Sequence, residues 1–360
     1  LASTLLERTR PHFEEGGKLA RLKPVFQALD TFLFAAPYKT HNRPFGRDAL
    51  DVKRYMSMVI IALFPSFIAG LYFFGWRLLL MLIVSYVAGG LVEVLFAVIR
   101  KEEINEGFLV TGFIFPLILP PGIPLWMVAV GVIFGVLVGK EIFGGTGRNL
   151  FNAALVGRVF LFLGYPSAMT SNWIQPAGSV WGRLGMLPSL APAEAVTSAT
   201  PLVQGKAGQF AEPLDLFLGN VMGSAGETSA LAILLGGVFL LAVGVASWRT
   251  VLGVLLSFSA LTALLHAVVP EVVSPLWFFL LSGGFLFGTF FMATDPVTGP
   301  ITLPAKFAYG VLIGLTTLII RSFSGFVEGV MFAILFGNIC APLIDEVVIR
   351  SRMRRYAGER

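Results

Sequence analysis

The sequence predicts an all-α polytopic membrane protein with about ten transmembrane helices, arranged as two inverted five-helix repeats. Hydrophobic residues make up 56% of the 360 residues and charged residues only 13%, with a mean hydropathy of +0.82. A soluble domain has about a quarter of its residues charged. The apolar residues form long uncharged blocks near the roughly 20 residues that one membrane-spanning helix needs. These blocks lack the period-two alternation of a membrane β-barrel, so the spans are predicted to be helices.

Five blocks of mostly apolar residues in the first half each predict one span. Arg77 closes the first block, the single acid Glu93 interrupts the second, and Pro120-Pro121-Gly122 end the third. The polar turn 144–149 follows the fourth block, and the fifth contains Arg158. The predicted spans lie at about 55–74, 78–99, 107–119, 125–138 and 150–164.

The second half is predicted to contain five more spans. Residues 165–225 come first and are rich in Pro, Ser, Gly and Ala, with apolar pieces too short to cross a bilayer. The spans that follow are predicted at about 227–246, 250–268, 276–293, 305–320 and 326–345.

Positive charge predicts the orientation. With ten spans, the basic N-terminal segment, the 100–103 and 140–148 turns, Arg249, Lys306 and the 350–355 tail fall on one side, while Arg77 and Arg321 fall on the other. Because cytoplasmic loops carry the excess of Lys and Arg, both termini are predicted to be cytoplasmic. The same placement explains the net charge of +5, so no nucleic-acid partner is inferred.

This topology divides the chain into five parts. Residues 1–54 are a cytoplasmic N-terminal segment, 55–164 the first five-helix repeat, and 165–225 an extracytoplasmic loop. Residues 226–345 form the second repeat and 346–360 a cytoplasmic basic tail. The Gly/Phe/Pro pattern of 107–122 is echoed at 284–300, and that of 150–155 at 335–343. Since each half has an odd number of spans, a repeat must be inverted, as in many secondary transporters. The alternative is that Gly/Phe/Pro-rich membrane helices resemble one another by composition alone.

Cysteine and histidine usage limits the chemistry of the chain. The single Cys340 excludes an intrachain disulfide, and the three histidines, His12, His41 and His266, lie far apart. No zinc, haem or iron–sulfur pattern is present, so no transition-metal site is predicted. No G-x-G-x-x-G pattern follows a strand either, so a dinucleotide would bind elsewhere. Any redox cofactor must be organic or supplied by a partner.

The long loop contains a short hydroxyl-rich stretch, Thr197-Ser198-Ala199-Thr200-Pro201. By itself it reads as a plain Ser/Thr loop that ends at a proline. It also approximates the Ser/Thr-Gly-Ala-Thr signature of membrane flavoproteins, in which the last threonine carries FMN through a phosphoester bond. Ser198 stands where that signature has glycine, and Glu194 stands where an aspartate is usual.

Other stretches make the resemblance specific. The chain resembles the membrane B subunit of the sodium-translocating NADH:quinone oxidoreductase at the stretches 12–18, 139–149, 226–229, 291–296 and 341–345. The related D subunit of the Rnf electron-transfer complex shares the membrane core and lacks the long N-terminal segment. That segment favours the quinone oxidoreductase.

The resemblance implies a membrane flavoprotein subunit of a redox-driven sodium pump in the bacterial inner membrane. It implies covalent FMN at Thr200 with the motif residues Thr197, Ser198 and Ala199, noncovalent riboflavin, a quinone substrate and transported Na⁺. The implied partners are an NADH/FAD/iron–sulfur subunit, a second FMN subunit, small membrane subunits, a flavin transferase and the lipid bilayer. The flavins supply the redox chemistry, and the protein supplies position and electrostatics.

Charged residues inside predicted spans are candidate functional sites, because charge in the bilayer is costly and such groups usually face a cavity or a partner. Gly89, Gly90 and Glu93 are quinone-binding candidates by resemblance. The alternative is a helix–helix contact at the two glycines, with Glu93 paired to an arginine. Asp295, Asp345 and Glu93 are sodium-path candidates, although Asp345 also fits a solvated helix end.

Arg158 and Glu227 complete the set of candidates. The sequence leaves open whether Arg158 pairs with Glu227 or with a flavin phosphate. One alternative from another functional class also remains open. An inverted five-helix repeat is a transporter architecture, and a non-redox solute transporter would have no use for a threonine that accepts a flavin.

Overall fold

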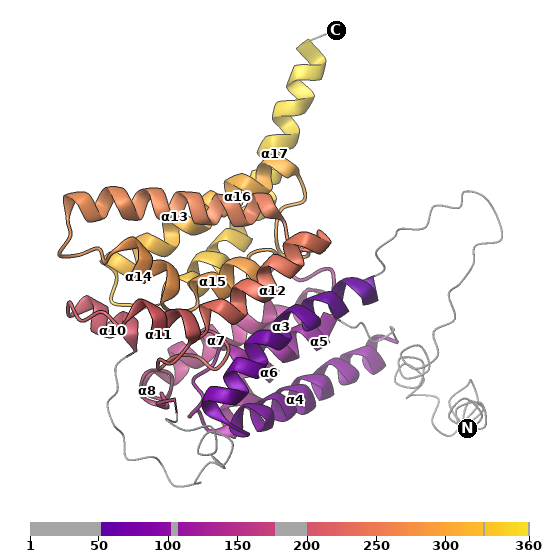
Figure 1. Cartoon of the computed structure of the whole chain (residues 1–360). Coiled ribbons are helices and arrows are strands. Elements are labelled where there is room, and N and C mark those ends of the chain that lie inside the picture. Colours follow the sequence, from indigo (N-terminus) through magenta and orange to yellow (C-terminus); the bar gives the residue numbers. More distant parts are fainter. Residues whose placement is uncertain (1–51, 102–106, 177–199, 327, 359–360) are drawn as a thin grey trace, which may run out of the picture.

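The fold comes from a computed structural model, which describes residues 52–101, 107–176, 200–326 and 328–358. Within these ranges every regular element is helical, and the helices pack into one bundle (Figure 1). The predicted N-terminal segment lies almost entirely outside the described residues, and so do Thr197, Ser198 and Ala199.

Six helices are long and apolar enough to cross a membrane. They are α3 (Val52–Phe74), α4 (Arg77–Arg100), α6 (Leu125–Gly139, continued by the 3₁₀ turn η2 at Glu141–Phe143), α13 (Trp248–Val268), α16 (Leu303–Phe323) and α17 (Val330–Gly358). Three shorter apolar helices accompany them: α5 (Gly107–Leu117), α7 (Ala153–Gly164) and α12 (Ala230–Val243). The predicted polytopic helical membrane protein is confirmed.

Two predicted elements differ from the structure. The span predicted at 276–293 is broken into α14 (Leu276–Leu281), α15 (Phe285–Phe287) and the π-helix η3 (Gly288–Met292). The break falls at Gly283, whose φ of +65° favours glycine, because a side chain there would be strained. The last span, predicted at 326–345, also differs, because the helix α17 continues without a break from Val330 to Gly358.

The helices begin where the local sequence provides caps. The Asn152 side chain accepts hydrogen bonds from the backbone N–H of Ala154 and Leu155 and so starts α7. Ser229 and Ser247 cap α12 and α13 in the same way. Such caps satisfy the free N–H groups of a first helical turn, which a bilayer interior cannot hydrate. Residues 165–225 contain, in their described part, only the short helices α8 (Pro166–Ser171), α10 (Pro201–Lys206) and α11 (Pro213–Leu218).

Small residues bring the long helices into close contact. A Cβ on Gly135 of α6 would lie 2.5 Å from the carbonyl oxygen of Ala153 on α7. A Cβ on Gly310 of α16 would lie 2.4 Å from the carbonyl oxygen of Thr250 on α13. Because lipid tails are as apolar as the helices, such close backbone packing is a main source of helix association in membranes.

The bundle has two ends that carry different chemistry. We call the basic end the one where α4 and α6 finish and where α3, α5 and α7 begin, since contacts between Arg100, Lys140 and their partners join the helix ends there. We call the loop end the opposite one, which carries α8, α10 and α11 (Figure 1).

Candidate functional site

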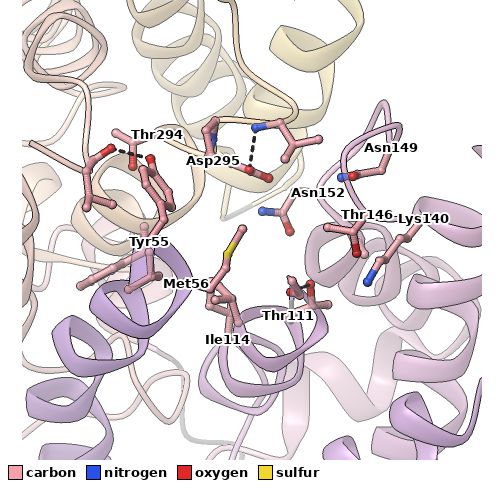
Figure 2. Close-up of a pocket in the computed structure, with 18 of the residues that line it drawn as sticks. Tyr55, Met56, Thr111, Ile114, Lys140, Thr146, Asn149, Asn152, Thr294 and Asp295 are labelled. Carbon is pink, nitrogen blue, oxygen red and sulfur yellow. Dashed lines mark hydrogen bonds between the residues drawn. The ribbon is translucent and has the colours of Figure 1, made fainter. Parts of the chain in front are cut away.

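A small polar cavity of about 70 Å³ lies at the basic end (Figure 2). We call it the Asp295 pocket. It lies among the first turns of α3 and α5, the end of α6, the turn before α7 and the chain after the broken helix α15–η3. Its polar lining comes from Tyr55, Thr111, Lys140, Thr146, Asn149, Asn152, Thr294 and Asp295. Polar groups gathered between interrupted helices are the usual surroundings of a transported ion in membrane proteins.

Asp295 supplies the carboxyl group of this pocket. Its carboxylate accepts hydrogen bonds from the Val297 backbone N–H at 3.0 Å and from the Thr298 hydroxyl at 3.1 Å. Across the described ranges, no Lys or Arg nitrogen lies within the 4.0 Å of an ion pair with it. The buried Thr146 hydroxyl in the same lining has no hydrogen-bond partner. Carboxylate and hydroxyl oxygens are the ligands that hard cations prefer.

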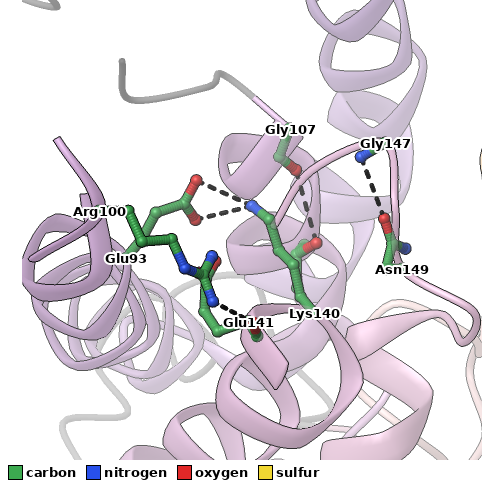
Figure 3. A network of polar contacts seen from close by, with 8 residues as sticks. Glu93, Arg100, Gly107, Lys140, Glu141, Gly147 and Asn149 are labelled. Atoms are coloured by element: carbon green, nitrogen blue, oxygen red, sulfur yellow. Dashed lines mark hydrogen bonds and ion pairs between the residues drawn. The ribbon is translucent and has the colours of Figure 1, made fainter. Parts of the chain in front are cut away.

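Glu93 of α4 is buried and pairs with Lys140, which directly follows α6 (Figure 3). The Lys140 ammonium donates to both Glu93 carboxylate oxygens at 2.8 Å. Glu93 therefore does have a cation partner, as the alternative expected, but this partner is a lysine and not an arginine. Arg100 instead pairs with Glu141 at 2.8 Å and also donates to the Glu141 backbone carbonyl. Each acid has its own cation, as the high cost of unpaired charge in a bilayer requires.

The two quinone candidates on α4 have different surroundings. A Cβ on Gly89 would lie 2.6 Å from the Phe108 ring of α5, so Gly89 is needed for the contact between these two helices. A Cβ on Gly90 would meet only the edge of the same ring, at 3.5 Å. Gly89 thus fits the helix-contact interpretation, while Gly90 leaves more room beside α4.

Asp345 stabilises the chain that enters α16. Its carboxylate accepts hydrogen bonds from the backbone N–H groups of Ile301 and Thr302, at 2.7 and 2.9 Å, and from the Thr302 hydroxyl at 2.6 Å. Asp345 does not line the Asp295 pocket. Asp295 begins the 295–302 connection and accepts hydrogen bonds near its start, whereas Asp345 accepts hydrogen bonds at its end. Among the described residues, no hydrogen bond joins the two acids.

A cluster of charges lies at the loop end. We call it the Arg158 cluster. The guanidinium of Arg158, 2% exposed, lies 3.2 Å from a Glu227 carboxylate oxygen, donates to the Ser224 hydroxyl at 3.3 Å and pairs with Glu328. The buried Arg321 donates to the backbone carbonyls of Phe279 and Ser282. Arg158 thus pairs with protein carboxylates, and both of its terminal nitrogens are in use.

Thr200 lies next to this cluster. It immediately precedes α10, and its side chain makes no capping hydrogen bond. It lines a cavity of about 20 Å³ together with Glu227, Glu328 and Gly283. On the same short helix, Lys206 donates to the carbonyls of Ser324 and Phe326, and partial burial lowers the pKa of its ammonium. The last motif residue therefore offers a hydroxyl at the loop end that caps no helix.

Several residues of these sites were not predicted as site residues. Among the charged ones, Lys140 and Arg321 entered the sequence analysis through the topology, Lys140 also through the 139–149 stretch, and Glu328 was not singled out. A lone acid between two apolar blocks does mark a candidate site in a sequence, because its charge needs a cation partner inside the bundle. The sequence does not say which cation that is.

The fold and its internal ion pairs define the class of protein: a polytopic membrane protein that keeps paired charges within its helix bundle. The chain belongs to the NQR2, RnfD, RnfE family, whose profile matches residues 39–354. It is 39% identical to the B subunit of the Na(+)-translocating NADH-quinone reductase of Azotobacter vinelandii over 399 residues, with 97% of each chain covered. The subunits of the same name from Pseudomonas paraeruginosa and Klebsiella pneumoniae are also 39% identical, over 401 and 407 residues, covering 98% of this chain and 97% and 98% of theirs. The chain is thus a homologue of these B subunits.

Proposed function

We propose that this chain is the membrane flavoprotein subunit of a redox-driven sodium pump. In this proposal it passes electrons from NADH, oxidised on another subunit, through covalent FMN toward quinone, and Na⁺ crosses the membrane in the same cycle. The similarity to the B subunits over nearly the whole of both chains carries the proposal. It supports the assembly with NADH/FAD/iron–sulfur, FMN and small membrane subunits that the resemblance implies, and the presence of riboflavin, to which we assign no residues.

The position of Thr200 supports its role as the FMN attachment site. Its hydroxyl is not used for capping, and Thr200 is one of the partly exposed residues of the loop end. The adjacent cavity is only about 20 Å³ and is lined by Glu227 and Glu328, which already pair with Arg158, so a flavin attached to Thr200 would lie outside this cavity. Arg158 then acts as a structural partner of Glu227. When bound, FMN would supply the electron-transfer chemistry.

The attachment is tested by in-gel fluorescence of the denatured protein, expressed in a host that has the flavin transferase. The wild-type chain should give a fluorescent band, and Thr200→Ala should give a dark one. Thr170→Ala is the matched control, because Thr170 is also an exposed loop-end threonine and its hydroxyl only bonds its own helix. Mass spectrometry of the peptide containing Thr200 locates the flavin. A wild-type band without fluorescence would contradict the proposed covalent attachment of FMN.

The packing supports the inverted repeat. In the first half α4 packs on α6 and α6 on α7, and in the second half α13 packs on α16 and α16 on α17. The corresponding helices α3 and α12 also pack on each other, as do α7 and α17. This pairing is expected for a two-fold axis in the membrane plane. We propose that 55–164 and 226–345 are the two repeats in the bacterial inner membrane, with the basic end cytoplasmic and the 165–225 loop periplasmic.

We propose that sodium enters through the Asp295 pocket. Asp295 has no basic partner among the described residues, while Glu93 is already paired and Asp345 stabilises the 295–302 connection. Glu93 and Asp345 would thus affect the sodium path indirectly, through the residues that they bind. We propose that quinone binds beside Gly90, on the side of α4 that has more room and that lies next to Glu93. The Asp295 pocket is tested by Asp295→Asn, which should raise the sodium concentration that half-saturates NADH:quinone activity.

A D subunit of an Rnf complex is the second candidate, because the family includes it. The two candidates are separated by measuring both activities of the purified complex. NADH:quinone activity favours the sodium-translocating NADH:quinone oxidoreductase, and ferredoxin:NAD activity favours the Rnf complex. A non-redox transporter is the third candidate, and it predicts an unflavinylated Thr200.

A further inference from the structure

Lys140 belongs to two sites at once. Its ammonium pairs with both oxygens of Glu93 at 2.8 Å, and the same side chain lines the Asp295 pocket. In Figure 2, Lys140 and Asp295 lie on opposite sides of the pocket, with Asn152 and Thr146 between them. We propose that Lys140 is a tethered counter-cation that Glu93 holds away from Asp295, and that this hold sets the sodium affinity of the pocket. The inference rests on the sodium role proposed above.

The charges of the three residues give the reason. Glu93 and Lys140 neutralise each other, which leaves the pocket with the single negative charge of Asp295. One bound Na⁺ makes the site neutral. An ammonium and a sodium ion carry the same charge, so only one of them can neutralise Asp295 at a time. The affinity for sodium therefore depends on where the Lys140 ammonium is held.

The Lys140 side chain is suited to a change of partner. Lys140 has a flexible four-carbon stem, which suits a charge that moves between two acceptors. It is 3% exposed, so without Glu93 its ammonium would be buried and unpaired. Asp295, which lines the same cavity and has no ion pair within the described ranges, is the carboxylate that it would then meet. Glu141, the next residue in the chain, already has Arg100 as its ion-pair partner.

Glu93 is therefore a positioning residue, and removing it should place Lys140 in the pocket. The test measures the sodium dependence of NADH:quinone activity of the whole complex in membranes. Glu93→Gln should raise the half-saturating sodium concentration at least about tenfold, which corresponds to a loss of about 1.4 kcal/mol in binding free energy. The joint replacement Glu93→Gln/Lys140→Gln should bring it back to within about threefold of wild type, because the competing cation is gone.

The rescue separates this inference from a direct role of Glu93. If Glu93 itself bound sodium, the joint variant would be as weak as the single one, and that result would overturn the proposal. Glu141→Gln is the matched control. It removes a buried carboxylate one residue from Lys140, but from a pair that does not line the pocket, so the half-saturating sodium concentration should stay within about twofold.

A second variant tests the proposal even if the Glu93→Gln protein does not assemble into the complex. Lys140→Gln alone leaves two carboxylates near the pocket and should keep the half-saturating sodium concentration at or below that of the wild type. A higher value would contradict the proposal. The proposed function fails separately, since it fails if the wild-type complex shows no sodium-stimulated quinone reduction. Sodium stimulation that none of the Glu93 or Lys140 variants alters would refute only the inference.

Discussion

Replacing Arg158 by methionine perturbs a buried charge cluster at the loop end of the bundle. Methionine keeps a long unbranched side chain but removes the charge and all five N–H donors. Glu227 and Glu328 then lose their ion pairs with Arg158, and Ser224 loses a hydrogen bond. The side chains of Glu227 and Glu328 are only 3% and 18% exposed, so water cannot fully replace the lost partner.

The structure sets the size of the effect. Breaking a buried ion pair by removing one partner costs about 3–5 kcal/mol, and two carboxylates depend on Arg158. We expect Arg158→Met to lower the free energy of unfolding by an amount in this range. The joint replacement Arg158→Met/Glu227→Gln leaves only the more exposed Glu328 without its partner. It should therefore recover roughly 2 kcal/mol relative to the sum of the two single replacements.

The measurement is an SDS titration of the purified protein in mixed micelles, with helical content followed by circular dichroism. Arg350→Met is the control. Its ion pair with Glu346 joins side chains that are 68% and 51% exposed, and such a pair contributes less than about 1 kcal/mol. Equal losses for Arg158→Met and Arg350→Met, or strict additivity in the joint variant, would refute the expectation that the buried Arg158 ion pairs stabilise the bundle more than an exposed pair does.

Three further predictions concern packing and caps. Gly310→Leu places a Cβ atom 2.4 Å from the Thr250 carbonyl oxygen, so the folded protein should be largely lost from size-exclusion profiles. Gly325→Leu is the control and should be tolerated, because no atom beyond those of its chain neighbours lies within 4 Å of the new Cβ. Asn152→Ala removes the cap of α7 and should cost about 1 kcal/mol in the same SDS titration, with no measurable loss arguing against the cap. Asp345→Asn weakens three hydrogen bonds to the start of α16 and should cost about 1.5–3 kcal/mol. Faster amide hydrogen exchange at Thr302 would report this loss directly, and unchanged exchange would contradict it.

Much of the fold was predictable because the bilayer imposes simple rules. A block of apolar residues must form a helix, and the charges and prolines between blocks mark its ends. The predicted span at 276–293 failed for a local reason. Its composition is apolar throughout, but Gly283 takes a left-handed conformation and breaks the helix. Hydropathy averages over a window and does not detect a single backbone turn.

The sites were predictable in part. Glu93, Arg158, Glu227 and Asp295 stood out because ionisable residues in apolar blocks need a partner or a cavity. Their partners did not follow from the sequence. Glu93 pairs with a lysine 47 positions away, and Arg158 pairs with Glu328 at a separation of 170.

Local composition and short motifs are enough to establish that this protein is a helical membrane protein, where most of its spans lie, and which family it resembles. Three other features required the folded bundle: Lys140 lines the Asp295 pocket, Arg158 pairs with carboxylates, and Thr200 lies beside that cluster. These are contacts between distant segments. They depend on how the helices pack, and helix packing is fixed by side-chain shape and close backbone approach across the whole bundle.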